Sequence, residues 1–190
     1  MAMTATTKAV FAVPVLESVK TNKSERRVTL PEVLTALVED GYVLQVDADR
    51  ALKDWRTTPS DAHPLMIVSQ AKLKSLKAPL RNLDVERLTE WMAGRVELAY
   101  YHIDPLKIDM RAVTDVMSSD YASKRNILPV EVRGKDVVIA TSEPFMSAWQ
   151  RDLGDMLKYN IKVVIANPQD IARYVGEFYN LSRSDRKSVV

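Results

Sequence analysis

The sequence contains no cysteine, and only five of its 190 residues are glycine. Without cysteine the chain can form no disulfide, thiol nucleophile or thiolate metal site, a composition typical of a reducing compartment such as the cytoplasm. The few glycines fit neither the Gly-x-x-x-x-Gly-Lys-Ser/Thr phosphate loop nor the Gly-x-Gly-x-x-Gly dinucleotide motif. We therefore predict that this chain does not itself hydrolyse nucleotide and is not an enzyme.

An excess of one charge and a long apolar run are also missing. The 27 basic and 25 acidic residues leave a formal net charge of +2, far below the concentrated basic field that nucleic-acid binding needs. The most apolar early stretch, residues 9–16, is interrupted by Pro14 and followed by Glu17, so it is too short to span a bilayer. We expect no nucleic-acid partner and no direct membrane insertion.

Histidine and tryptophan give little sign of a ligand site. His63 and His102 lie far apart in the sequence without neighbouring metal ligands, so we predict no metal site and no cofactor, and we interpret His102 as an ordinary strand residue. Trp55, Trp91 and Trp149 each fall on the apolar side of a predicted helix. That position favours filling of a core or a groove over stacking on bases.

The sequence also gives little support for a catalytic hydroxyl or carboxyl group. Ser142 follows a predicted strand, where catalytic groups do occur, but it has neither the glycines of a nucleophile elbow nor a histidine nearby in the sequence. We interpret it as a cap or turn before Pro144. Asp152 and Asp155 lie on the polar side of a predicted helix, which indicates a solvated face. A deep polar pocket at residues 141–144 would instead favour a small enzyme.

The first part of the chain has the pattern of a small helical subdomain. Residues 1–28 show no sustained period and are expected to form a flexible leader. Thr29 and Pro31 predict the start of a helix that stops at Gly41. Further helices are predicted from about 47 to 58, from 64 to 76 and, after a hinge at 79–82, from 84 to 94. We assign residues 29–78 to the helical subdomain, a degenerate repeat.

The pattern changes after residue 94 and predicts helices packed against a small sheet. Strands are expected at 98–103, 127–132, 137–140 and 161–166, with helices at 111–124, 146–157 and from Asn167-Pro168 to 181. Gly134 lies in a hairpin turn, and Pro129 predicts an edge position for its strand. The predicted class is α+β: a helical subdomain, then a two-layer helix/small-sheet subdomain at 83–181, then the start of a linker at 182–190.

Several short motifs in this second part occur in an unusual order. They are Ile103-Asp104-Pro105-Leu106-Lys107-Ile108-Asp109, Tyr121-Ala122, Ile127-Leu128-Pro129-Val130, Val138-Ile139-Ala140-Thr141 with Glu143-Pro144, and residues 164–167 with Asp170-Ile171. In this order they resemble the N-terminal domain of type II secretion and type IV pilus assembly ATPases. In that family a run ending in Leu-Pro opens a strand, a hydrophobic-Ala strand end followed by x-x-Pro leads into a helix, and a strand-helix unit closes the module.

The first part resembles, more faintly, the helical repeat that precedes this module in the family. Some members use tandem copies to bind cyclic di-GMP, with an arginine against guanine or phosphate and a glycine for close backbone approach. Here Glu32 replaces the arginine, Leu34 the glycine and Trp55 a glutamine, and a second copy at 64–91 also lacks the Arg-x-Gly opening. We predict that cyclic di-GMP binding is weak or absent. The matching positions are Leu37, Val38, Gly41, Val43, Ala51 and Leu52.

The resemblance implies docking. It predicts a domain, cytoplasmic and peripheral to the inner membrane, that couples a C-terminal ATPase domain through a linker to the cytoplasmic domain of an inner-membrane platform protein. The docking surface would be an exposed part of the helices in residues 29–78 or an edge of the sheet. The alternative is a cyclic di-GMP sensor in which Arg26, Arg27 or Arg81 substitutes for the missing arginine. A third hypothesis is an unrelated enzyme that uses carboxylates at strand ends.

Overall fold

A computed structural model describes residues 25–187 of the chain. The helices and strands follow one another as α1 (Leu30–Glu39), α2 (Gln45–Thr57), α3 (Pro64–Gln70), α4 (Val85–Arg95), β1 (Ala99–Tyr100), a short 3-10 helix η2 (Pro105–Lys107), α5 (Met110–Val116), α6 (Ser119–Arg125), β2 (Ile127–Arg133), β3 (Asp136–Thr141), α7 (Ala148–Leu157), β4 (Asn160–Ile165) and α8 (Pro168–Lys187). None of the helices in this part of the chain has the length and apolar content needed to cross a membrane.

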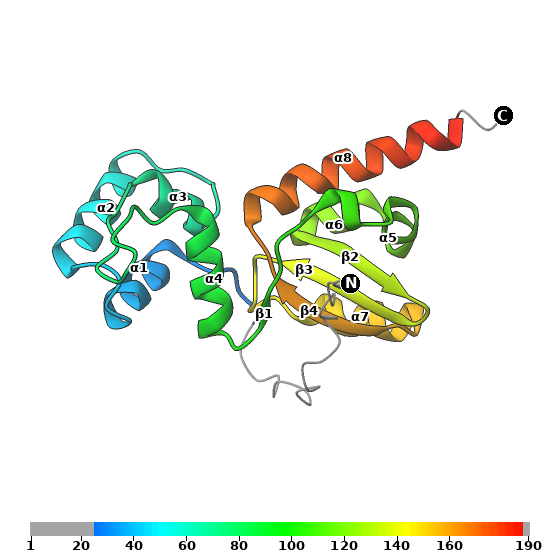
Figure 1. Cartoon of the computed structure of the whole chain (residues 1–190), viewed down its shortest axis with the longest axis horizontal. Coiled ribbons are helices and arrows are strands. Elements are labelled where there is room, and N and C mark those ends of the chain that lie inside the picture. Colours follow the sequence, from blue (N-terminus) through cyan, green and yellow to red (C-terminus); the bar gives the residue numbers. More distant parts are fainter. Residues whose placement is uncertain (1–24, 188–190) are drawn as a thin grey trace, which may run out of the picture.

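These elements form two units that lie side by side (Figure 1). The helical unit consists of α1 to α4, and the sheet unit contains a four-stranded sheet of order β1-β4-β3-β2 with the remaining helices. In the sheet, β1, β4 and β3 run parallel, while β2 pairs antiparallel with β3. The structure therefore confirms the predicted α+β class.

The helical unit begins where the capping pattern predicts. The Glu32 carboxylate accepts hydrogen bonds from the Thr29 backbone N–H at 3.1 Å and from the Thr29 hydroxyl at 2.9 Å. Pro31 stands in the first turn, where a helix needs no N–H from it. The apolar residues of α1 then recur at helical spacing, and the helix packs against α2 and α3. The core of this unit includes Leu37, Leu65, Val68, Leu88 and Met92.

The β2–β3 hairpin confirms two predictions from sequence. Gly134 adopts a φ of +60° in the turn, a conformation that favours glycine. Pro129 lies on β2, an edge strand of the sheet, and the pairing register with β3 shifts between Pro129 and Glu131. A proline has no N–H to donate, so an edge strand with an irregular register is where it is tolerated.

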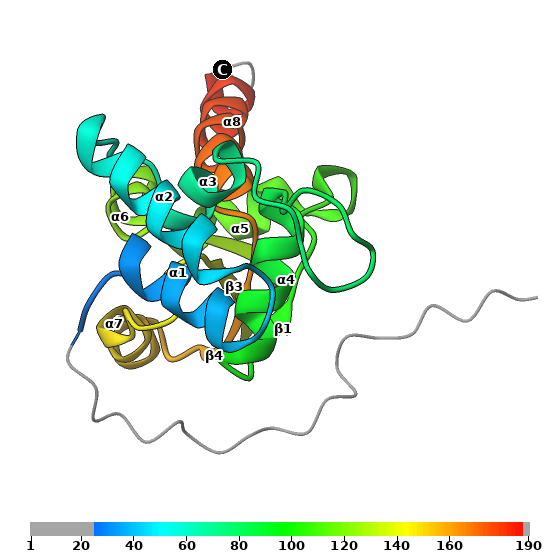
Figure 2. The same ribbon diagram turned by 90° about the vertical axis from the view of Figure 1, so that its left-hand side faces the viewer.

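Helices cover both faces of the sheet. In Figures 1 and 2, α5, α6 and α8 lie on one side of the sheet and α7 lies on the other, which adds a layer to the predicted two. All β3 residues from Val137 to Thr141 are buried, as expected for a strand covered on both faces. Trp149 of α7 and Phe178 of α8 are among the largest fully buried side chains and supply cover from opposite sides.

The helical unit packs on one end of the sheet, at the carboxyl ends of the parallel strands. Ile165, the last residue of β4, belongs to the core of the helical unit. Tyr100 at the end of β1 and Phe145 after β3 are half-buried against the same core. The parallel strands thus end against α1 to α4 and not against solvent.

The segment after α3 differs from the prediction of a helix over 64–76. α3 ends at Gln70, and Lys72 adopts a left-handed φ of +52° that stops the helix. The chain then folds back in a loop, where the Ser75 N–H donates to the Arg81 carbonyl at 2.8 Å and the Leu83 N–H donates to the Leu73 carbonyl at 2.8 Å. Figure 2 shows this loop projecting from the helical unit beside α4. The predicted helix is therefore confirmed over residues 64–70 and wrong over residues 71–76, where backbone hydrogen bonds build a hairpin-like loop.

The predicted helix over 111–124 is two helices. Met117 is extended, and its carbonyl accepts a hydrogen bond from the Tyr179 hydroxyl at 3.0 Å. Ser118 then caps α6 by accepting from the Tyr121 N–H at 3.2 Å. Two other boundaries also move: the strand expected at 98–103 is reduced to Ala99–Tyr100, and the helix expected from residue 146 begins at Ala148.

The last helix runs beyond its predicted end at residue 181. α8 continues to Lys187, and its Ser182 is 8% exposed where a linker was expected to begin. The Thr114 hydroxyl donates to the Ser182 hydroxyl oxygen at 3.1 Å, which ties α8 to α5. Leu181, predicted on the buried side, is 52% exposed. The boundaries of the predicted subdomains stay predictions, although Leu88 of α4 lies in the helical core.

The predicted leader falls largely outside the described residues. Its described part begins at residue 25 and lies against the sheet unit. The Glu25 carboxylate accepts from the backbone N–H groups of Ser147 at 2.8 Å and Ala148 at 2.6 Å, at the start of α7. Val28 is buried. Residues 25–28 are therefore held in place by contacts with a unit more than 100 residues away in the sequence.

The indole of Trp149 gives a test of the sheet core. Its ring is fully buried, and its Nε1–H has no hydrogen-bond partner among the described residues. Trp149→Phe removes this unsatisfied donor and is expected to cost less than about 1.5 kcal/mol. Trp149→Ala leaves a cavity and is expected to cost about 3–5 kcal/mol. Urea unfolding followed by circular dichroism measures both, and equal losses for the two variants would contradict the packing described.

Candidate functional site

The carboxyl edge of the parallel strands is the first place to look for a site, because open parallel sheets bind ligands there. In this chain the edge is covered by the helical unit. Thr141 at the end of β3 and the two residues that follow it, Ser142 and Glu143, are between 1% and 3% exposed. The strand-end groups that sequence singled out are therefore not open to a substrate.

His63 lies at this edge, a position that its sequence context did not predict. Its Nε2 is 3.1 Å from the carbonyl oxygen of Ser142, and its Nδ1 accepts a hydrogen bond from the Leu65 N–H at 3.3 Å as the cap of α3. An imidazole that accepts at Nδ1 and donates at Nε2 is neutral. Burial accordingly lowers the pKa of His63 to about 4, against a smaller opposing effect of the Ser142 carbonyl.

Glu143 completes this junction without forming a catalytic triad. Its Oε2 accepts from the Val28 N–H at 2.8 Å, and its Oε1 lies 3.8 Å from His63 Nε2. Burial raises the pKa of Glu143, while the Val28 hydrogen bond and the charge of Arg27 oppose the rise. His63 faces the backbone carbonyl of Ser142, and a base positioned for nucleophilic attack would have to face its hydroxyl. The junction therefore has a structural role: it gives hydrogen-bond partners to the buried Val28 N–H and the buried Ser142 carbonyl.

A second polar junction joins α4 to the ends of β1 and β4. Glu86 of α4 accepts hydrogen bonds from the Tyr100 hydroxyl and, at 3.1 Å, from the Asn167 side-chain amide. His102 Nδ1 lies 2.9 Å from the same carboxylate. His102 therefore lies beyond the end of its strand and pairs with Glu86. In the part of the chain that the structure describes, no cluster of histidine and carboxylate side chains is arranged to hold a metal ion.

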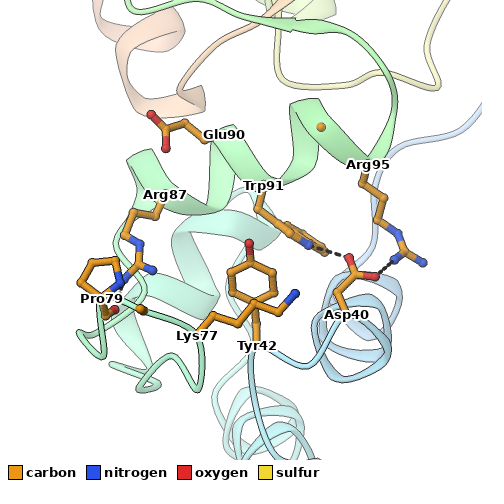
Figure 3. Close-up of a pocket in the computed structure, with 10 residues that line it drawn as sticks. Asp40, Tyr42, Lys77, Pro79, Arg87, Glu90, Trp91 and Arg95 are labelled. Atoms are coloured by element: carbon orange, nitrogen blue, oxygen red, sulfur yellow. Dashed lines mark hydrogen bonds and ion pairs between the residues drawn. The ribbon is translucent and has the colours of Figure 1, made fainter.

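An open groove lies on the outer surface of the helical unit, between α4 and the loop that precedes it (Figure 3). Its volume is about 690 Å³. It is lined by Asp40, Tyr42, Lys77, Ala78, Pro79, Arg87, Glu90, Trp91, Gly94 and Arg95.

One wall of the groove is fixed by a network around Asp40. Its Oδ2 accepts from the Trp91 indole N–H and its Oδ1 from the Arg95 guanidinium, both at 2.7 Å. Arg95 also pairs with Glu39 at 2.7 Å. Partial burial raises the pKa of Asp40, but the hydrogen bonds from Trp91 and Arg95 outweigh it, so the pKa lies below its ordinary value. Trp91 is thus held as a wall of the groove.

The rest of the groove lining includes basic and aromatic side chains from the loop, from Tyr42 and from α4. Lys77 Nζ lies 4.6 Å from the centre of the Tyr42 ring, which meets Trp91 edge to face with 6.3 Å between ring centres. Arg87 donates to the Pro79 carbonyl at 3.0 Å. Neither Lys77 nor Arg87 forms an ion pair with a carboxylate of residues 25–187. A cation beside an aromatic ring, with a second cation in the same groove, can bind an anionic group together with an apolar one.

The three tryptophans have different environments. Trp149 is a core residue and Trp91 lines the groove, as the interpretation of core or groove filling predicts. Trp55 is half-buried on the helical unit, and its indole N–H donates to the Ser60 carbonyl at 3.3 Å.

The repeat position that carries an arginine in the resembled family is occupied by a bound carboxylate. Glu32 both caps α1 and pairs with Arg26 at 2.6 Å. The Arg26 guanidinium also lies 4.3 Å from the centre of the Phe145 ring. Of the three arginines considered as substitutes, Arg26 therefore lies beside the position of interest, but it is already neutralised. Arg81 lies in the loop before α4, some distance away in the sequence.

Comparison with known proteins identifies the relatives of this chain. Residues 96–185 match the MshEN domain family. The chain is 35% identical over 127 residues to the type IV pilus assembly ATPase TfpB of Acinetobacter baylyi. That match covers 66% of this chain but only 22% of the relative, so the chain spans about a fifth of the length of the curated protein it matches.

Two solved structures share the fold. The structure of MshE with cdg has a TM-score of 0.54 and 21% identity, and the match covers 80% of this chain and 100% of that chain. The N-terminal domain of XpsE has a TM-score of 0.50 and 14% identity, with 82% of this chain and 99% of that chain covered. The likeness extends over both units described above, since it includes most of the chain.

The buried junction predicts a pH dependence of stability. The lowered pKa of His63 means that the unfolded chain binds a proton first between the ordinary value of 6.5 and about 4, so acidification through this window destabilises the fold. The raised pKa of Glu143 acts in the opposite direction, because the folded chain takes up that proton first. Glu143→Gln keeps an acceptor for Val28 and leaves only the His63 effect, on the order of 3 kcal/mol over the window.

The free energy of unfolding of Glu143→Gln should therefore fall more steeply than that of the wild type as pH decreases through this window. Urea titrations at a series of pH values measure the difference. His63→Asn, which retains a capping side chain, is the matched control and should show a shallower fall than the wild type. Parallel pH profiles for all three proteins would contradict the assignment of charge states at this junction.

Proposed function

We propose, from its similarity to the N-terminal domains of secretion and pilus ATPases, that this chain is a non-catalytic regulatory and docking domain. In this proposal it couples a C-terminal ATPase domain to the cytoplasmic domain of an inner-membrane platform protein. The observation that carries the proposal is the match of residues 96–185 to the MshEN domain family, together with a chain that spans 22% of the pilus ATPase to which it is similar.

The division of labour follows from what the sequence contains. It holds no phosphate-loop motif, so ATP hydrolysis by a longer protein would reside outside these 190 residues. The strand ends that a small enzyme would use are covered, and the Ser142 residue is 1% exposed. A docking role needs no reacting groups, only a surface that another protein can recognise. In this proposal the chain lies in the cytoplasm and is held at the inner membrane by its partner.

The groove is a better docking surface than an edge of the sheet. β1 offers only two residues for pairing with another strand. β2 is interrupted by Pro129, and the first part of the strand, from Ile127 to Val130, is buried. The groove, in contrast, is open and carries the exposed cation of Lys77 beside the Tyr42 ring. We assign the docking role to this part of the helical unit.

A cyclic di-GMP sensor is the second candidate, since the MshE structure with cdg shares this fold. The ligand is anionic, and its recognition in the resembled repeat depends on an arginine. In this chain the carboxylate of Glu32 takes that position, and the neighbouring Arg26 is paired with it. Leu34, at the position of the glycine, is 3% exposed and part of the core. Electrostatics and steric fit both oppose binding.

Docking is tested by binding of the purified chain to the cytoplasmic domain of the platform protein of the same secretion or pilus system. Isothermal titration should show saturable one-to-one binding, because a pre-formed surface recognises its partner without prior folding. The sheet-edge variant Arg133→Gln, at an exposed position of β2, serves as the matched control and should bind as tightly as the wild type. Absence of binding to the platform domain, with both proteins folded by circular dichroism, would contradict the docking proposal.

Thermal unfolding with cyclic di-GMP tests the second candidate. A ligand present at about one hundred times its dissociation constant stabilises a protein by about 2.7 kcal/mol. We expect no shift of the melting temperature at high micromolar ligand, with an MshE domain as the positive control. Glu32→Gln, which removes the negative charge but keeps an acceptor for Thr29, should also show no large gain, since the arginine is still missing. Micromolar or tighter binding by the wild type would overturn the expectation.

A further inference from the structure

The loop that forms one wall of the groove is strongly basic. We define the basic loop as residues 71–83, which contain Lys72, Lys74, Lys77 and Arg81 and no acidic residue. The whole chain has a net charge of only +2, so the rest of the sequence is net acidic. Positive charge is therefore concentrated on a segment that projects beside α4 (Figure 2).

The basic loop also exposes two large apolar side chains. Leu80 is 72% exposed and Leu76 is 49% exposed. The backbone around them is fixed, because the Leu76 N–H donates to the Tyr42 carbonyl at 2.8 Å and the Ser75 N–H donates to the Arg81 carbonyl at 2.8 Å. Ser75 is buried and its hydroxyl donates to the Lys77 carbonyl at 2.9 Å. The leucines are thus held at the surface by an ordered loop.

Apolar and cationic groups continue from the loop into the groove. Tyr42 and Trp91 supply the aromatic part of the lining, and Lys77 lies over the Tyr42 ring (Figure 3). Arg87 is anchored by the Pro79 carbonyl with no carboxylate partner among the described residues. The arrangement presents cations around an aromatic surface, with two leucines at the rim.

We propose that the basic loop and the groove bind an acidic, leucine-bearing segment of the partner protein. This inference rests on the proposed docking function and names the chemistry of the partner. Carboxylates of the segment would meet Lys77, Arg81 and Arg87, while its apolar side chains would pack on Tyr42, Trp91 and Leu80. The basic loop carries four basic residues and no acidic one, so its charge selects an acidic partner, while the groove itself is lined by the carboxylates of Asp40 and Glu90 as well as by cations. A groove of about 690 Å³ holds several side chains of a polypeptide.

A concave site favours a polypeptide over a flat anionic membrane. Lys77 lies over the Tyr42 ring on the loop side of the groove, and Arg87 belongs to α4 on the other side. A bilayer surface can approach the tip of the basic loop but not both walls of a groove. Anionic vesicles are therefore the competing occupant that an experiment has to separate from an acidic peptide.

The charge-reversal variant Lys77→Glu/Arg81→Glu tests the site in the full chain. Binding to the cytoplasmic platform domain should weaken at least about tenfold, and its dependence on salt concentration should become shallower, since long-range attraction is lost. Lys124→Glu/Lys135→Glu changes the same number of charges on the sheet unit and should alter the dissociation constant by less than about twofold. Circular dichroism and thermal melts confirm that both variants fold.

A photo-reactive amino acid at Leu80 locates the partner segment directly. Cross-linking to the platform domain followed by mass spectrometry should yield a peptide that is net acidic and contains leucine. If the wild type binds the platform domain but Lys77→Glu/Arg81→Glu binds equally well, the groove inference is wrong while the docking function stands. A cross-linked peptide that is basic or neutral would overturn it too.

A partner-independent arm decides the case in which the platform domain does not bind at all. The probes are a fluorescein-labelled peptide of glutamate and leucine and, separately, phosphatidylglycerol vesicles. Binding of the peptide to the wild type, lost in Lys77→Glu/Arg81→Glu and retained in Lys124→Glu/Lys135→Glu, supports the inference. Lack of peptide binding at millimolar concentration overturns it, as does co-sedimentation with vesicles that is lost in the same variant without any peptide binding.

Discussion

The rest of the structure depends on how the helical unit covers the carboxyl edge of the parallel strands. Ile165 ends β4 and is fully buried within the helical core, so the two units share apolar surface. Burial of a strand edge leaves polar groups that must find partners. His63 pairs with the Ser142 carbonyl just after β3. The Glu86 carboxylate accepts hydrogen bonds from Tyr100 at the end of β1 and from Asn167 just after β4. Apolar packing drives the contact, and the two polar junctions fix its register.

This cover determines where recognition can take place. Parallel sheets commonly bind ligands in the crevice beyond the carboxyl ends of their strands. Here α1 to α4 occupy that position, and the Thr141–Glu143 segment is buried. What stays open on the helical unit is its outer surface, where Tyr42, Trp91 and the basic loop lie. A fold that uses its most common ligand site to join two units is suited to binding partners on its exterior.

Local signals in the sequence predicted the parts of the fold that local chemistry controls. The turn at Gly134, the edge position of Pro129 and the start of α1 at Thr29 each follow from one residue type in a short context. Long-range contacts were not predictable in this way. At the break between α5 and α6, the Tyr179 hydroxyl donates to the Met117 carbonyl from 62 residues away. His63 and Ser142 are 79 residues apart, and only the packing of the units brings them together. The groove likewise brings together side chains from between Asp40 and Arg95 in the sequence. Their apolar periodicity indicates separate helices and does not indicate a shared groove.

One helix links the groove to the sheet. The inner side of α4 buries Leu88 and Met92 in the helical core, while Glu86 near its start binds Tyr100 of β1 and Asn167, which precedes α8. The outer side of the same helix supplies Trp91 and Arg95 to the wall of the groove. A helix of 11 residues is short and stiff, so its outer and inner contacts move together. The position of the groove is therefore set relative to β1 and to the start of α8, and a partner held in the groove is held in a defined place relative to the helix with which the described chain ends.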